Sequence, residues 1–226
     1  MESRTDQRAC RHQPRDGVSR VYANKRAGGL LWKNLRSQKL RKKRYGKVER
    51  RGTISNRVSI DDRATIVETR SRIGDWEADT VIGKNHRQAI VSIVERKTGF
   101  TLIQKVERKT ALAVSQAMIG LLKPHRKKVH TITSDNGKEF AGHEEVASKL
   151  KANFYFAHPY SSWERGTNEN TNGLIRQYFP KNRDFTTITQ QEINMAMERL
   201  NNRPRKRLGY QTPSQVFFKS GVALHI

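Results

Sequence analysis

Apolar residues between positions 76 and 107 follow the patterns of β-strands. The segments 76–83 and 88–107 predict three strands, of which the last two are joined by a short hairpin connection at 97–99. The second strand is apolar on both faces, so we expect it to be buried. Its apolar positions are Ile90, Val91, Ile93 and Val94. The region therefore predicts an antiparallel meander.

After residue 107 the apolar period changes, and helices alternate with strands. The predicted elements are a helix at 110–123, a strand at 128–133, a helix at 142–151, a strand at 153–160, and helices at about 163–178 and 188–202. Thr110 is a candidate N-cap with Pro124 beyond the helix end, and Thr189 and Glu192 have capping-box spacing. This order predicts a mixed five-stranded sheet with helices on both sides.

The first third of the chain is more basic than the rest. Residues 1–74 hold 21 Lys and Arg against 7 Asp and Glu, so they carry +14 of the formal net charge of +24. We expect residues 1–20 to lack order, and the apolar residues 30–35 after Gly28-Gly29 to form one helix. The segment 41–52 is either a solvated linker or a segment that follows phosphates. A charge of +24 favours nucleic acid as the partner.

A chain of 226 residues can hold one core and an additional segment. Its single cysteine, Cys10, excludes an internal disulfide. It has neither an apolar run near 18 residues nor the hydrophobic region of a signal peptide, so we expect no membrane span and a cytoplasmic, nucleoid-associated protein. The expected domains are an unordered N-terminus at 1–20, a basic arm at 21–72, a catalytic core at 73–218 and a tail at 219–226.

Acidic residues in the first strand are candidate metal ligands. Asp75, Glu77 and Asp79 are spaced by two and so face one side of an extended strand. Asp79 leads directly into an apolar run, where an unpaired carboxylate is costly and a metal ion would satisfy it. Surface salt bridges account better for Asp75 and Glu77.

Two further acids follow later in the chain. Asp135 ends the fourth strand, but the next residues, Asn136-Gly137, are also a strong hairpin signal, so Asp135 is either a turn residue or a ligand. Glu164 and Glu169 lie about 140° apart around a helix and cannot share a site. Glu169 has basic and amide residues on its own face, which suits either a solvated face or a metal ligand beside a phosphate.

The segments DWEADT, TSDNGKEF and WERGTNENTNGLIRQYFPK together resemble acid-triad transposases and retroviral-type integrases. More narrowly, they resemble the bacterial transposases of the insertion sequence thirty family. In this resemblance Asp79 follows a Trp by three, Asp135 lies in a D-N-G-x-x-F block, and Glu169 comes after 33 intervening residues. Asn172 and Arg176 fit further positions three and seven residues beyond that Glu.

The resemblance implies a ribonuclease-H-like core in which Asp79, Asp135 and Glu169 hold two Mg²⁺ or Mn²⁺ ions. It implies hydrolysis at the element ends, then attack of the freed 3′-hydroxyl on target DNA, by a homo-multimer. We expect DNA contacts from Arg165, Asn172 and Arg176, from Arg203, Arg205, Lys206 and Arg207, and from Arg41, Lys42, Lys43 and Arg44.

The resemblance also has departures. Family members usually begin with a helix-turn-helix domain, which we expect this chain to lack, and Ala64 stands where Pro is expected. The chain is therefore either a nuclease and strand transferase or a DNA-binding remnant without end recognition. A cellular nuclease for RNA–DNA hybrids is a third alternative, against which the segment 166–181 argues.

Three other places carry residue types that are common in sites. His143 with Glu144 and Glu145 favours a solvated surface over a metal site. His158 is expected to pack rather than to contact DNA. Trp163, near a helix start, is expected in the core rather than stacked on a base.

Overall fold

The structure is a computed structural model. It describes residues 20–21, 23–34, 54–84, 88–159 and 161–219. Some sequence predictions concern residues outside this part, namely Cys10, the basic residues 41–44, the tail 220–226 and nearly all of residues 1–20. The chain divides into two compact units, 1–52 and 53–226. Within the described segments, no helix combines the length and apolar character that crossing a membrane requires.

In the first unit a helix precedes the two glycines. Residues 20–21 and 23–26 are helical, and a 3-10 turn spans Leu31–Asn34. Gly28 has φ +80°, a conformation that glycine adopts without strain. The side chain of Asn24 accepts a hydrogen bond from the Leu31 N–H at 3.1 Å, which closes the bend. The helix expected after the glycines is therefore a single 3-10 turn, because the bend directs the local hydrogen bonds back to Asn24.

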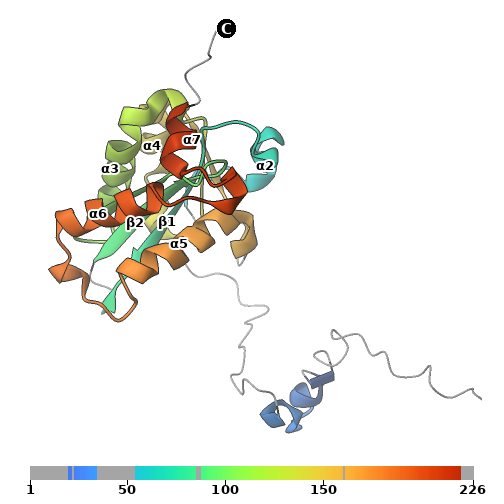
Figure 1. The fold of residues 1–226 in the computed structure, drawn as a ribbon. Coiled ribbons are helices and arrows are strands. Elements are labelled where there is room, and N and C mark those ends of the chain that lie inside the picture. The colour runs from blue at the N-terminus through green and yellow to red at the C-terminus, as the bar shows by residue number, and fades with distance from the viewer. Residues whose placement is uncertain (1–19, 22, 35–53, 85–87, 160, 220–226) are drawn as a thin grey trace, which may run out of the picture. The chain divides into compact units, whose positions relative to one another are not determined.

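The second unit is built on the mixed five-stranded sheet that the sequence predicts (Figure 1). The strands are β1 (Asp75–Ile82), β2 (Ala89–Glu95), β3 (Thr101–Val106), β4 (Thr131–Ser134) and β5 (Asn153–Phe156). Their order is β3-β2-β1-β4-β5, with antiparallel pairing from β1 to β3 and parallel pairing of β1 with β4 and of β4 with β5. Every residue of β2 is buried, as its apolar faces predict.

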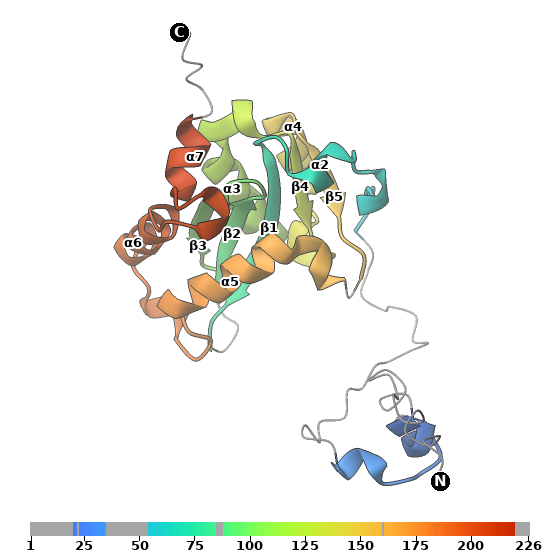
Figure 2. The same cartoon turned by 45° about the vertical axis from the view of Figure 1, so that its right-hand side comes forward.

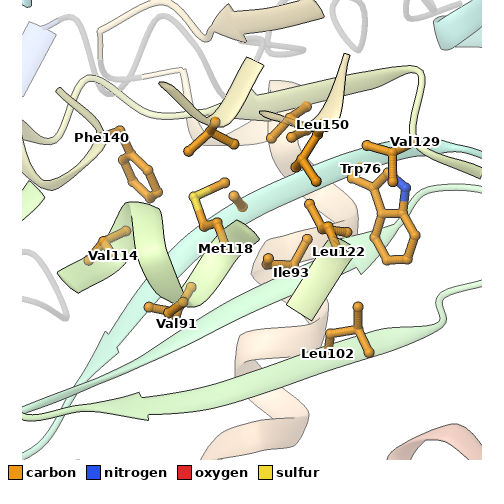
Figure 3. Close-up of a cluster of buried hydrophobic side chains, with 14 of the residues drawn as sticks. Trp76, Val91, Ile93, Leu102, Val114, Met118, Leu122, Val129, Phe140 and Leu150 are labelled. Atoms are coloured by element: carbon orange, nitrogen blue, oxygen red, sulfur yellow. The ribbon is translucent and has the colours of Figure 1, made fainter. Parts of the chain in front are cut away.

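Helices cover both faces of the sheet. They are α2 (Ile66–Thr69), α3 (Ala111–Leu122), α4 (His143–Leu150), α5 (Gly166–Tyr178), α6 (Gln190–Asn201) and α7 (Pro213–Lys219). One core contains side chains of α3, α4 and α7, with Trp76, Val91, Met118 and Leu122 among its members (Figure 3). The second core lies on the opposite face, beneath α5 and α6. In Figure 2, α5 passes in front of β1.

The helix starts follow the capping residues that the sequence offers. The Thr110 hydroxyl accepts a hydrogen bond from the Ala113 N–H at the start of α3. At the start of α6, Thr189 and Glu192 form both hydrogen bonds of the capping box. Each cap satisfies main-chain donors that have no partner within the helix.

Residues 54–72 belong to the same compact unit as the sheet. Val67 is fully buried, and the buried Arg63 side chain donates a hydrogen bond to the Thr133 hydroxyl at 2.8 Å. Ser59 forms an isolated bridge to Phe156 at the free edge of β5. The segment therefore partly covers an edge that would otherwise expose unpaired main-chain groups.

Candidate active site

Asp79 lies in β1, on the face that α5 covers. In the register of the sheet it is opposite Ser92 of β2. The Asn172 side chain, on α5, donates a hydrogen bond to Asp79 Oδ2 at 3.0 Å and accepts one from the Ser92 hydroxyl at 2.9 Å. Because Ser92 occupies the amide oxygen, the Asn172 NH₂ group points at the carboxylate. The chain Ser92–Asn172–Asp79 thus fixes the orientation of the acid.

Asp135 follows β4, the parallel neighbour of β1. Its Oδ1 accepts a hydrogen bond from the Gly137 N–H at 2.9 Å, which is the bond of an Asx turn. A 3-10 turn (Lys138–Phe140) and then α4 follow, so no hairpin forms. Asp135 therefore forms the turn with its Oδ1 atom, and its Oδ2 atom is directed toward the site.

One guanidinium joins the two acids. Arg165, in the 3-10 turn before α5, places Nη1 3.3 Å from Asp79 Oδ2 and Nη2 3.6 Å from Asp135 Oδ2. Burial raises the pKa of the Asp79 carboxyl; the charge of Arg165 opposes this rise and the charge of Asp135 adds to it. The ends of two parallel strands therefore bring two carboxylates together around one cation.

Glu169 is exposed on α5, within the stretch of helix that contacts β1. The Asn168 N–H donates to Glu77 Oε2 at 2.8 Å, and Asn172 contacts Asp79. Among the described residues no three His, Cys, Asp or Glu side chains converge as metal ligands. The structure brings Asp79 and Asp135 together and does not add the Glu169 carboxylate to them.

The donor set suits a hard divalent cation. Mg²⁺ is commonly bound by one or two carboxylates together with water and substrate phosphates. Asp79 and Asp135 supply such a pair, and the Arg165 guanidinium already lies where a cation interacts with both. These residues fit one ion, and a second ion would need a further ligand such as Glu169.

Asp75 and Glu77 do not form the surface salt bridges that we expected. Their exposures are 1% and 0%, and both are paired inside the protein. Asp75 pairs with Arg72 at 2.9 Å, and Glu77 Oε1 lies 3.1 Å from Arg96 Nη1. Burial raises the pKa of Glu77, against the charge of Arg96. The prediction is wrong about location because helices cover both faces of the sheet, so the acidic side of β1 faces α5 rather than water.

Sequence reasoning missed Glu139, which supports the site from behind. It lies in the NGKEF segment and is only 8% exposed. Its Oε1 accepts a hydrogen bond from the Thr80 hydroxyl at 3.0 Å and pairs with Lys109 Nζ at 2.6 Å. It thereby ties the turn after Asp135 to the residue next to Asp79. The available signal was an acid four residues after Asp135, directly before the apolar Phe140.

The structure also corrects three predictions near the site. His158 does not pack in the core: its ring lies between Asp61 and Glu164, at 2.9 and 2.8 Å, in a partly exposed position. Hydrogen bonds to Glu164 and then Asp61 raise its pKa. Trp163 is 73% exposed, because the 3-10 turn that carries it directs the ring outward.

His143 is the third correction. It is 4% exposed and packs against Phe154 and Phe156, since it lies on the inner face of α4. Its neighbours Glu144 and Glu145 are exposed, as expected.

The basic residues expected at DNA differ in their surroundings. Arg176 donates a hydrogen bond to the Ile82 carbonyl at 2.8 Å. Arg205 and Arg207 donate to main-chain carbonyls. Arg205 is half-buried, whereas Arg203, Lys206 and Arg207 are exposed.

The sheet order and the flanking helices define a ribonuclease-H-like fold, that of integrase catalytic cores. Among solved structures, the catalytic core of BIV integrase aligns with 65% of this chain and 94% of its own, with a TM-score of 0.50 and 24% identity. That likeness concerns the fold alone.

The sequence comparisons point to a narrower group. The chain is 52% identical over 198 residues to the transposase for insertion sequence element IS4351 of Bacteroides fragilis, an alignment that covers 87% of this chain and 61% of that protein. It is 40% identical over 196 residues to transposase InsI of element IS30A of Escherichia coli, covering 84% of this chain and 50% of that protein. No protein-family model matches. The chain is thus a homologue of IS4351 and IS30-family transposases, and it spans half to three fifths of their length.

Proposed function

We propose that this chain carries the catalytic core of a transposase, which cleaves DNA at the ends of an insertion element and joins the freed ends to target DNA. The observation that carries the proposal is the pair of carboxylates, Asp79 and Asp135, that two adjacent parallel strands hold around one guanidinium. The identity to insertion-element transposases over most of the chain supports it. Because the two carboxylates are intact, we favour an enzyme over a remnant that only binds DNA.

Asp79 and Asp135 would hold Mg²⁺ or Mn²⁺, and Glu169 would join them from α5 to complete a site for two ions. Such ions, when bound, lower the pKa of an attacking water or 3′-hydroxyl and offset charge on the reacting phosphate. Glu169 lies one turn before Asn172, so a modest adjustment of α5 or of its side chain would bring the third carboxylate in.

The remaining residues of the site position these ligands. Asn172 orients Asp79, and the Gly137 N–H fixes one oxygen of Asp135. Arg165 would leave the two carboxylates when a metal ion takes its place. Its planar guanidinium is then suited to a non-bridging oxygen of the substrate phosphate.

The proposed partner is duplex DNA, both as element end and as target. The charge of +24 gives the chain a long-range attraction to any polyanion. We also propose a homo-multimer, since two element ends must be joined together, and a cytoplasmic location at the nucleoid.

Nicking of supercoiled plasmid DNA tests the proposal without knowledge of the end sequence. The wild-type chain should nick plasmid in Mn²⁺ or Mg²⁺ and not in EDTA. Asp135→Asn should abolish nicking while the far-ultraviolet circular dichroism spectrum is retained. Asp62→Asn, which changes an exposed acid outside the site, should nick like wild type. Equal activity of Asp135→Asn and wild type would contradict the assignment.

A further inference from the structure

A second site lies on α5, away from the acids. A cavity of about 240 Å³ opens beside the first turn of this helix. Three arginines line it: Arg70, which follows α2, and Arg205 and Arg207, which follow α6. Figure 1 shows the segment after α6 passing close to the start of α5. Segments that are far apart in the sequence thus place three positive charges around one space.

Within the described part of the chain none of these three arginines forms an ion pair, although the charge of Glu95 acts on Arg207 and the charge of Arg70 acts on Glu77 from further away. Arg205 donates to the Leu200 carbonyl at 3.1 Å, and Arg207 donates to the Lys97 carbonyl at 2.7 Å. Both acceptors are uncharged. Burial lowers the pKa of Arg207, and the charge of Arg70 lowers it further. Since arginine stays protonated in proteins, three like charges face this cavity and favour an anion in it, although Arg70 and Arg207 are also exposed to water.

The turn between β2 and β3 makes room for one of these side chains. Gly99 has φ +72°, which favours glycine, and a Cβ atom there would lie 2.4 Å from Arg207 Nη2. The guanidinium therefore lies directly over the turn. Its hydrogen bond to the Lys97 carbonyl holds Arg207 beside the cavity.

The size and the polar lining of the cavity indicate the kind of anion. Its volume is several times the ~30 Å³ of a water molecule and below the roughly 300 Å³ at which pockets enclose larger ligands. That range suits one phosphate group better than a whole nucleotide. The lining includes Gly166 and Thr167 at the positive end of the 13-residue α5, and the buried Thr167 hydroxyl has no hydrogen-bond partner among the described residues.

The cavity and the acid pair lie on different flanks of α5. Residues 167, 170, 171 and 174 line the cavity at the spacing of one helix face, while Asn172 reaches Asp79 from the other side. A helix with its side chains is about 10–12 Å wide. The axial rise is 3.4 Å per nucleotide and consecutive phosphates of one strand lie further apart than that, so this width spans at most about three nucleotides.

We propose that this cavity binds one backbone phosphate of a DNA strand that crosses α5, within about three nucleotides of the phosphate at the acids. The proposal rests on the proposed function, because it takes DNA as the substrate. The site would set the distance between a fixed phosphate and the reacting one, so it positions the strand and carries no base specificity.

Salt-dependent binding of a duplex, measured by fluorescence anisotropy in EDTA, tests the site separately from catalysis. Arg70→Gln and Arg207→Gln should each lower the slope of log K against log salt by about 0.9, the value for one phosphate contact. At 0.1 M salt, a slope that is lower by about 0.9 corresponds to roughly eightfold weaker binding by the variant than by wild type. Arg199→Gln, an exposed arginine of α6 outside the cavity, is the matched control and should bind more tightly than either variant.

A scan of single methylphosphonates along the strand identifies the phosphate. One neutral position, within about three nucleotides of the cleavage site, should weaken binding by wild type and leave binding by Arg70→Gln unaffected. Arg70 makes no side-chain hydrogen bond within the described residues, so its substitution should spare the fold even if Arg207→Gln does not. Equal scans for wild type and Arg70→Gln would overturn the proposal. If inorganic phosphate saturates the cavity while DNA binding is unchanged, the proposal is also overturned. The cavity would then be a site for a free anion. If wild type does not nick plasmid DNA but the methylphosphonate scan gives the predicted result, only the proposed function is contradicted.

Discussion

Replacing Asn172 by alanine should detach α5 from the acid of β1. The change removes a hydrogen bond to the Asp79 carboxylate at 3.0 Å and another from the Ser92 hydroxyl at 2.9 Å. A hydrogen bond to a charged group contributes about 1.5–3 kcal/mol and one between neutral groups about 0.5–1.5 kcal/mol. Alanine recovers up to about 0.7 kcal/mol as the better helix former. We therefore expect the free energy of unfolding to fall by about 1.5–4 kcal/mol.

Urea denaturation of Asn194→Ala gives the matched comparison. Asn194 is an exposed residue of α6 whose side chain accepts a hydrogen bond from Gln190 at 2.9 Å. The helix propensity gained is the same in both variants, so the difference between them isolates the buried link. Asn194→Ala should change the free energy of unfolding by no more than about 0.5 kcal/mol. If Asn172→Ala loses no more than Asn194→Ala, Asn172 does not hold Asp79 and the reasoning is refuted.

Glu77→Leu should lower the free energy of unfolding in urea denaturation by about 3 kcal/mol, the low end for a broken buried pair, because Arg96 loses its buried carboxylate and keeps only the more exposed Glu68 at 3.2 Å; a loss below about 1 kcal/mol would contradict this. Thr189→Ala should cost about 1 kcal/mol in the same assay by deleting the capping box, and an unchanged midpoint would argue against it. His158→Gln tests a pH dependence. The Glu164 carboxylate raises the pKa of His158, so the stability that this contact adds is complete below the unfolded value of about 6.5 and disappears as pH rises through the folded pKa. In thermal melts across pH, the difference in melting temperature between wild type and the variant should shrink as pH rises. A constant difference would exclude the mechanism.

The strands, the helices and their order could be read from the sequence because period and capping are local signals. The capping box of Thr189 and Glu192 and the buried strand β2 are examples. The position of Asp135 at the end of β4 follows from the same pattern, since the helix after Gly137 rules out a hairpin.

The surroundings of individual side chains depended on contacts between distant segments. Glu77 is buried because α5, some 90 residues later, lies over β1 and its Asn168 N–H meets the carboxylate. Trp163 and His158 were misplaced for a related reason. An aromatic residue near a helix start predicts core packing for Trp163, and packing was also favoured for His158, but the 3-10 turn before α5 and the approach of Asp61 keep both at the surface. The cavity of three arginines joins segments after α2 and α6, and no local pattern indicates it.

The proposed function requires Asp79, Asp135 and Glu169 to act as one metal site on DNA. Its most direct test is the rate of plasmid nicking in Mg²⁺ by Asp79→Asn, Asp135→Asn, Glu169→Gln and the triple variant. Loss of about 4 kcal/mol of transition-state stabilisation is about a thousandfold in rate. We predict that each single variant falls at least that far and that the triple variant falls little further, because residues that act as a unit are not additive. Wild-type nicking by Glu169→Gln would contradict the claim.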